Sequence, residues 1–203
     1  MTKFDELHQL KAFFSSMDIS DSEKKKRSNF AYLLYDAIYF TFALIKVEKE
    51  IEERNFATND LVASQYRDTL ENRITDAFDR EGIPYEPDYI SRLVSDIMDT
   101  TNRHPDDPYY LSQDRALLIA QNESNTAYNH ADYENARKSG KQYKVWMTEG
   151  DNLVRLEHEE VDGVRIPIDE MFLVGSDMMR YPHDYLNGSP GNLINCRCIC
   201  LYE

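Results

Sequence analysis

The sequence predicts an α+β protein in which an N-terminal region of long helices precedes a small, mostly antiparallel β module. Apolar residues recur at helical spacing through the first two thirds of the 203 residues, and short strand-like runs separated by turns begin near Gln142. Between these regions, residues 101–110 carry two prolines and two aspartates, which is typical of a loop. We therefore expect a helical region over residues 1–110 and a second domain over residues 111–203, made of a long helix and the β module.

Helical periodicity and capping signals define the individual helices. Ser22 is the expected N-cap of the second helix, and Thr58 or Asn59 that of the third. Gly82 and Gly140 are expected to end the third and the last helix, because glycine is favoured just after a helix C-terminus. The expected helices cover residues 4–14, 22–54, 59–82, 89–97 and 112–140.

The β module is predicted from runs that are rich in β-branched or aromatic residues. These runs cover residues 143–147, 154–158, 164–168 and 196–202. Side chains alternate between the two faces of a strand, so Cys196, Cys198 and Cys200 would project from the same face of the last one.

Charge and composition restrict the partners of the chain. The formal net charge is −14 and the sequence pI is about 4.8, which opposes non-specific wrapping of nucleic acid. The basic run Lys24–Arg27 has acidic neighbours, so we interpret it as a solvated helix start that makes at most a local contact with DNA. No N-terminal segment has the pattern of a signal peptide, and we expect synthesis in a reducing cytoplasm.

The apolar run Phe30–Ile45 contains a single charged residue, Asp36. It is shorter than the roughly 20 residues that a membrane-spanning helix needs, and it is rich in tyrosine. We expect a buried or self-associating helix here and no membrane partner.

A set of residues in the C-terminal half resembles one known family. In order along the chain they are Ile119, Ala120, Glu123, Ala127, Tyr128, Asn129, Trp146, Thr148, Asp151, Arg155, His158, Asp162, Gly163 and the run Asn195–Cys198. Together they resemble the C-terminal domain of the phage Mu F-like minor head proteins of tailed phages. This resemblance does not reach residues 1–110.

The resemblance implies a minor capsid protein that acts in head morphogenesis and is not an enzyme. Such a protein would bind the portal or the major capsid protein inside the procapsid, and would take part in packaging or ejecting the genome. It would reside in the phage head, with host cytoplasm as its location during assembly, could form a homo-oligomer and could contact the packaged DNA.

The motif residues are expected to form a structural network without catalytic groups or a bound cofactor. Asp151, Arg155 and His158 could join Asn195 and Arg197 in a cluster of ion pairs and hydrogen bonds. Glu123 and Asn125 would cap a helix or connect the long helix to the sheet. The full predicted network is Glu123, Asn125, Trp146, Asp151, Arg155, His158, Asp162, Gly163, Asn195 and Arg197.

Two interpretations of the cysteines stay open. In one, they are small core residues, because unpaired cysteine is among the most buried residue types. In the other, His158, Cys196 and Cys198 are three ligands of a structural zinc ion, which requires four, and Cys200, His183 or Asp151 would complete the set. We favour core burial over metal binding.

The alternative from another functional class is a metal-dependent hydrolase, a nuclease or a toxin-like effector. His158 would then act as general base, with Asp151 or Asp184 as metal ligand. No second helix-borne histidine, nucleophile elbow or phosphate-binding loop supports this reading.

Overall fold

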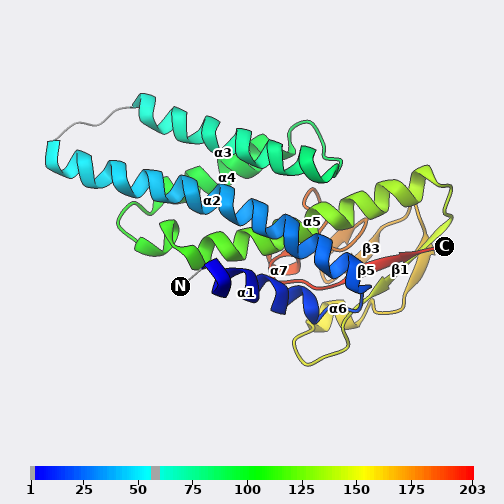
Figure 1. Ribbon diagram of the computed structural model, residues 1–203. Helices are drawn as coiled ribbons and strands as arrows, with labels where there is room; N and C mark the ends of the chain where they lie inside the picture. Colours follow the sequence, from blue (N-terminus) through cyan, green and yellow to red (C-terminus); the bar gives the residue numbers. More distant parts are fainter. Residues whose placement is uncertain (1–2, 56–59) are drawn as a thin grey trace. The chain divides into compact units, whose positions relative to one another are not determined.

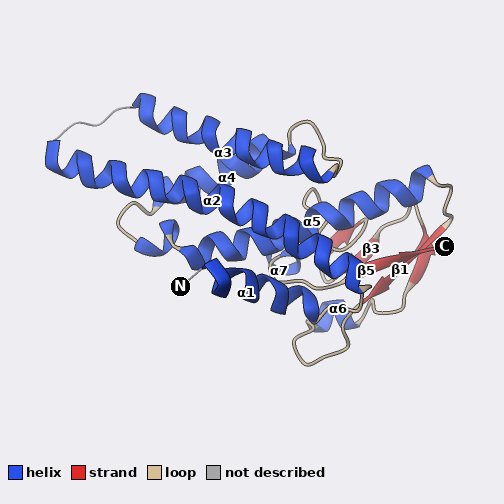
Figure 2. Ribbon diagram, in the orientation of Figure 1, coloured by secondary structure: helices blue, strands red, loops and turns tan. Residues whose placement is uncertain are grey.

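The computed structural model describes residues 3–55 and 60–203, and these residues adopt the predicted α+β fold (Figures 1 and 2). The long helices are α1 (Lys3–Ser15), α2 (Asp21–Asn55), α3 (Asp60–Glu81), α4 (Tyr89–Arg103) and α5 (Gln113–Lys138). The predicted loop at residues 101–110 contains the end of α4 and most of a 3₁₀ turn, η1 (Pro108–Leu111). The expected caps Thr58 and Asn59 lie outside the described residues.

Local signals set most helix ends. Gly82 and Gly140 have φ of 63° and 77°, the left-handed conformation that glycine adopts without strain, and they terminate α3 and α5 as predicted. The Ser112 Oγ accepts the Arg115 N–H at 3.1 Å, which caps α5.

The predicted cap of α2 was wrong. Glu23 donates its backbone N–H to the Oγ of Ser20 at 3.2 Å, and Ser22 lies inside the first turn. Both serines could cap by composition. Ser20 also has a glutamate three residues later, a pattern that favours it as the cap.

The chain forms two compact units, and both boundaries between them lie inside helices. The first unit consists of residues 1–28 together with 121–203, and the second of residues 29–120. This division differs from the domains expected at 1–110 and 111–203, because residues distant in sequence come together in the first unit.

The 29–120 unit is helical, with a core supplied by α2, α3, α4 and the first part of α5. Its buried apolar residues include Phe30, Leu34, Ile38, Phe42, Leu70, Ile74, Phe78, Ile90, Val94, Ile97 and Ala116. Arg115 is also buried and donates to the Thr101 Oγ1 at 2.8 Å and to the Ile97 carbonyl at 3.2 Å. Its charge is therefore hydrogen-bonded inside the unit.

Among the described helices, α2 over Asp21–Glu50 is long and apolar enough to cross a membrane by length and composition alone. Phe30, Leu34, Ile38 and Phe42 lie along it at helical spacing and are fully buried. Their burial accounts for the apolar content of this helix and agrees with the expected buried helix.

The other unit holds two small antiparallel sheets. The strands β1 (Tyr143–Met147), β2 (Arg165–Pro167) and β5 (Ile199–Tyr202) are ordered β2-β1-β5, with Val145 opposite Leu201 in the register of β1 and β5. A separate hairpin pairs β3 (Phe172–Val174) with β4 (Asp177–Met179). This hairpin was not predicted from the sequence, although Gly175-Ser176 between two apolar runs is a two-residue turn signal.

Two strand predictions need correction. The run 154–158 is not a strand, because Leu156–Glu159 forms the short helix α6, in which the His158 and Glu159 N–H groups both donate to the Arg155 carbonyl. Five residues are too few for apolar periodicity to distinguish the two structures. The last strand starts only at Ile199, after a short helix, α7 (Pro190–Leu193), and an extended segment.

Side chains of α5 supply hydrogen bonds to the backbone of this segment, as a neighbouring strand would otherwise do. The Asn125 amide donates to the Cys196 carbonyl at 3.0 Å, and the Asn129 amide donates to the Cys198 carbonyl at 3.2 Å. Buried carbonyl groups need partners, and here the partners come from a helix.

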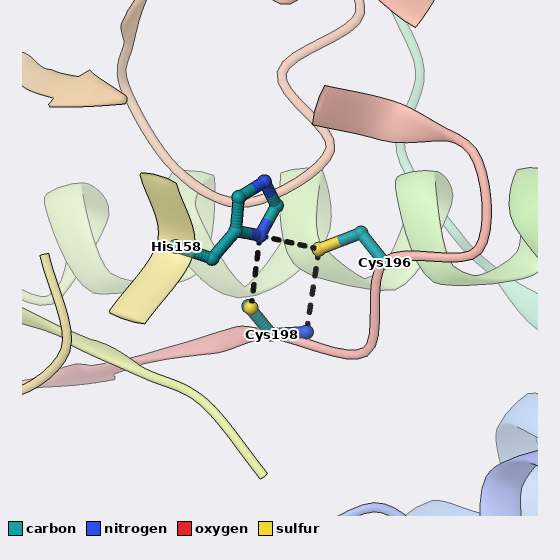
Figure 3. Close-up of side chains that lie close together, drawn as sticks. All are labelled: His158, Cys196 and Cys198. Carbon is teal, nitrogen blue, oxygen red and sulfur yellow. Dashed lines mark hydrogen bonds between the residues drawn. The ribbon is translucent and has the colours of Figure 1, made fainter. Parts of the chain in front are cut away.

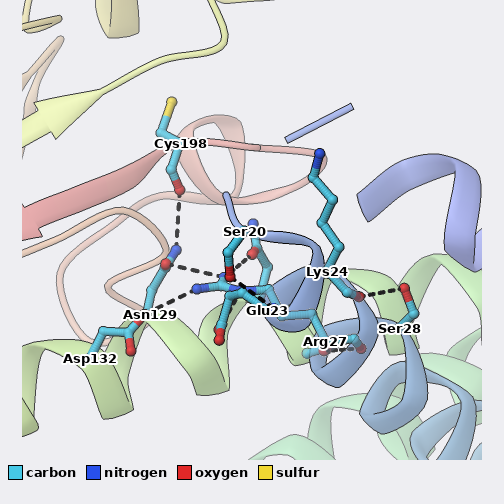
Figure 4. A network of polar contacts seen from close by, with 10 residues as sticks. Ser20, Glu23, Lys24, Arg27, Ser28, Asn129, Asp132 and Cys198 are labelled. Atoms are coloured by element: carbon cyan, nitrogen blue, oxygen red, sulfur yellow. Dashed lines mark hydrogen bonds and ion pairs between the residues drawn. The ribbon is translucent and has the colours of Figure 1, made fainter. Parts of the chain in front are cut away.

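The same asparagines accept hydrogen bonds from Arg27, which is 1% exposed (Figure 4). Its guanidinium also contacts Asp132 at 3.1 Å and Glu23 at 3.1 Å. The prediction that the basic run is solvated was therefore wrong for Arg27. Apart from Glu23, its acceptors lie about 100 residues away in the chain, beyond the reach of local sequence patterns.

We expect Arg27→Met to lower the free energy of unfolding by about 3 kcal/mol, because it leaves the buried Asn125 and Asn129 oxygens without a donor. Urea denaturation would measure the loss. The control is Arg137→Met in the last turn of α5, a half-exposed arginine paired with Glu134 and the exposed Asp169, whose loss should stay below about 1 kcal/mol. Equal losses for the two variants would contradict this role of Arg27.

Candidate functional site

The end of the chain and α6 bring one histidine and two cysteines together (Figure 3). The Nδ1 atom of His158 lies 3.3 Å from the Sγ of Cys198 and 3.6 Å from the Sγ of Cys196. All three side chains are buried, and their donor atoms lie within 4.8 Å of one another. We call these three residues the His-Cys-Cys cluster.

A hydrogen-bond chain fixes the His158 ring. Its Nε2 lies 3.2 Å from the Asn192 Oδ1, while the Asn192 Nδ2 donates to the Val174 carbonyl at 3.1 Å and to Asp177 at 2.8 Å. Because the Asn192 amide nitrogen is occupied as a donor, its oxygen accepts a hydrogen bond from the Nε2–H group of His158. The lone pair of Nδ1 then points toward the two sulfur atoms.

An apolar shell surrounds the cluster. Trp146 meets the His158 ring edge-on with centroids 5.7 Å apart, and packs against Phe172 at 5.3 Å. Cys196 and Cys198 belong to the same buried core, and the half-buried Cys200 packs against it. The cysteines therefore are core residues, as favoured from the sequence, and two of them also face a histidine nitrogen.

The two buried thiols differ in acidity. Their mutual hydrogen bonding, with His183 and His158 nearby, holds the pKa of Cys196 well below its ordinary value. The same hydrogen bond and burial raise the pKa of Cys198. Cys196 also accepts the Cys198 backbone N–H at 3.4 Å, so Cys196 is the thiol that loses its proton first.

The expected ion-pair cluster of five motif residues is divided in the structure. Asp151 pairs with Arg197 at 2.6 Å and 2.8 Å, and this hydrogen-bonded guanidinium lowers the pKa of Asp151. Arg155 donates instead to the carbonyl of Ile194. His158 contacts neither pair directly and faces the cysteines.

Asn195 has a structural position next to the cluster. Its φ of 59° is left-handed, its N–H donates to the Asn122 Oδ1 at 2.6 Å, and its own Oδ1 accepts from Gln121 at 2.9 Å. These bonds to α5 turn the chain just before Cys196. Glu123, another predicted motif residue, is half-buried on the same helix.

Asp162 and Gly163 close the turn after α6. Asp162 accepts the Thr148 N–H at 2.7 Å, and the Gly163 N–H donates to the Trp146 carbonyl at 2.8 Å. Gly163 has φ of 69°, which explains why the motif has glycine there. This turn positions Trp146 beside His158.

The carboxylates proposed for a metal-dependent hydrolase are already paired. Asp151 binds Arg197, and the fully buried Asp184 binds Arg180 at 2.6 Å. Neither carboxylate joins the His-Cys-Cys cluster. The described side chains thus provide no His-Asp arrangement for that chemistry.

Sequence reasoning missed three residues that shape this region. Asn192 orients His158, Glu149 lines a small cavity beside the cluster, and Lys144 is a buried cation on β1. Asn192 lies in a glycine- and proline-rich loop, where an asparagine is normally interpreted as a turn residue. The alternation of buried and exposed residues in β1 places Lys144 inside, although a lysine is seldom fully buried.

A family comparison identifies the class of protein. Residues 65–201, more than half of the chain, match the phage Mu protein F like family, and the chain belongs to that family. It is a family of structural phage proteins, and membership indicates a role in phage head morphogenesis. The search of curated proteins and the search of solved structures found no match.

The extent of this match corrects one expectation. The resemblance was expected to exclude residues 1–110, whereas the family match starts at residue 65. It therefore includes most of α3 and all of α4. Helices α3 and α4 lack the polar motif residues that carried the resemblance, which explains why this part went unnoticed.

We expect Gly163→Ala to destabilise the protein by about 1 kcal/mol, because alanine is strained at a left-handed φ. The matched control is Gly191→Ala in α7, where no positive φ opposes a side chain and stability should be unchanged or slightly higher. Urea denaturation would compare them, and equal effects would contradict a conformational requirement at Gly163.

Lys144 is fully buried, and its Nζ donates to the Arg180 carbonyl at 2.6 Å. It also lies over the rings of Tyr133 and Phe172 at 5.2 Å and 5.3 Å. Burial lowers the pKa of Lys144 to about 8, while the nearby Cys200 and Asp184 act in the opposite direction.

Lys144 should make stability depend on pH. Between its folded pKa of about 8 and its ordinary value of 10.5, the unfolded chain binds more protons, so the contribution of Lys144 to stability rises with pH. We expect the stability of the wild type, measured relative to Lys144→Met, to increase across this window in urea titrations.

The wild type must be compared with the variant because Cys200 opposes this trend: burial raises its pKa to about 12, so its contribution to stability falls as the pH rises. The control is Lys141→Met at an exposed site, which also removes one lysine charge. A flat difference for Lys144→Met would contradict the lowered pKa.

Proposed function

We propose that this chain is a minor capsid protein of a tailed phage or prophage. It binds the portal or the major capsid protein inside the procapsid and takes part in packaging or ejecting the genome. The observation that carries this proposal is the family match over residues 65–201.

The distribution of polar residues supports a structural role. In the unit formed by residues 1–28 and 121–203, the buried charges Arg27 and Asp184 are each engaged by hydrogen bonds or ion pairs. Such networks favour one fixed arrangement of a small module. A rigid module suits a component that must keep its shape in an assembly, and the paired state of Asp151 and Asp184 leaves the hydrolase alternative without support.

The helical unit offers surfaces for a partner. Phe40 and Val47 on α2 are 44% and 55% exposed, and Tyr109 in η1 is 44% exposed. Exposed aromatic and aliphatic residues are common where proteins associate. We assign partner binding to this unit and propose that the overall negative charge limits contact with packaged DNA to local basic positions.

Particles produced from the genome that encodes the chain provide the test. We expect mass spectrometry of gradient-purified heads to find the chain in fewer copies than the major capsid protein. Deletion of its gene should leave heads that fail to package or to deliver DNA, and supplying the wild-type chain should restore them. Finding the chain only outside particles, with normal particles after deletion, would contradict the proposal.

A further inference from the structure

The His-Cys-Cys cluster has the chemistry of a site for a borderline-soft metal ion. Histidine nitrogen and cysteine sulfur are preferred zinc ligands, and they gather here with no carboxylate among them. Burial of all three removes competing solvent. The cluster also includes residues 40 positions apart, so a bound ion would connect α6 to the end of the chain.

The spacing of the donor atoms fits tetrahedral coordination. Zinc binds sulfur at about 2.3 Å and nitrogen at about 2.0 to 2.1 Å, which separates a nitrogen and a sulfur ligand by about 3.6 Å around a tetrahedral centre. The two observed Nδ1–Sγ distances are 3.3 Å and 3.6 Å. A small outward movement of the Cys198 sulfur would therefore suffice.

The surroundings prepare the ligands as in established zinc sites. A ligating histidine usually donates its other ring N–H to a fixed acceptor, and Asn192 accepts from Nε2 of His158 in that way. In addition, the buried indole of Trp146 lies next to the cluster and hydrogen-bonds to Cys198. A buried N–H donor beside the sulfur atoms is typical of the outer shell that orients metal ligands.

The fourth ligand is none of the three expected from the sequence. His183 is committed to the Cys196 carbonyl at 2.7 Å, Asp151 is committed to Arg197, and Cys200 is not part of the cluster. Instead, a cavity of about 10 Å³ adjoins the cluster, and Glu149 and Arg197 are among its lining residues. That is roughly the space that one water molecule requires, with polar partners at hand.

We propose that His158, Cys196 and Cys198 bind one zinc ion whose fourth ligand is a water molecule in the cavity beside Glu149. The ion would stabilise the β module, whose strands are short and whose core is small. This inference does not depend on the proposed role in the phage head.

The first test measures zinc in the purified full chain. After incubation with zinc and removal of excess, elemental analysis should give about one zinc per chain, because the cluster provides one set of ligands. Removing the ion with a strong chelator should lower the thermal unfolding midpoint, and zinc should restore it. Zinc far below one per chain with no chelator effect would overturn the proposal.

Variants separate ligation from core packing. His158→Gln and Cys196→Ser should abolish tight zinc binding, whereas Cys200→Ser, which alters a third cysteine outside the cluster, should retain one zinc per chain. Circular dichroism of the apoproteins would show whether each variant is folded. If Cys200→Ser lost zinc as completely as Cys196→Ser while remaining folded, the assigned ligand set would be wrong.

Cobalt tests the fourth position. The cobalt-substituted chain should show charge-transfer absorption from two thiolates, and hydrosulfide should increase it by replacing the bound water with a third sulfur ligand. Glu149→Gln should keep the metal but weaken its binding by about 10- to 100-fold, as expected for an outer-shell group. An absorption spectrum that hydrosulfide leaves unchanged would overturn the water ligand.

Discussion

Asn125 and Asn129 of α5 connect the N-terminal and the C-terminal segments of the unit that contains the candidate site. Their amide oxygens accept from Arg27 near the start of α2, and their amide nitrogens donate to the carbonyls of Cys196 and Cys198. An amide can accept and donate at once, which a carboxylate or an ammonium cannot do. Two residues one helical turn apart thereby hold a buried guanidinium and an extended segment that has no neighbouring strand.

The geometry of the His-Cys-Cys cluster depends on this support. The segment 196–198 pairs with no strand, and α5 supplies hydrogen bonds to its Cys196 and Cys198 carbonyls, with His183 as a second partner of the Cys196 carbonyl. In this position, the side chains of Cys196 and Cys198 face His158 of α6. A hydrogen bond to Asn192 orients the His158 ring. The same arrangement serves core packing and presents three donor atoms, so the two interpretations of the cysteines are compatible.

The motif residues and the family match cover different parts of the chain. The polar motif residues carried the resemblance, and the structure gives several of them local tasks: Asp162 and Gly163 close a turn, and Asp151 pairs with Arg197. The family match nevertheless begins at residue 65, inside α3. Helices α3 and α4 lie inside the match without any of the motif residues that carried the resemblance.

The sequence by itself determined the α+β class, the long helices and the glycines that end α3 and α5, because these depend on periodicity and on local backbone preferences. It also indicated the family through the ordered motif. Only the tertiary structure decided that Leu156–Glu159 forms a helix, that Arg27 is buried, and that Asn192 and Glu149 lie close to the cluster. Those outcomes depend on contacts between residues far apart in the chain, whose energies no local pattern contains.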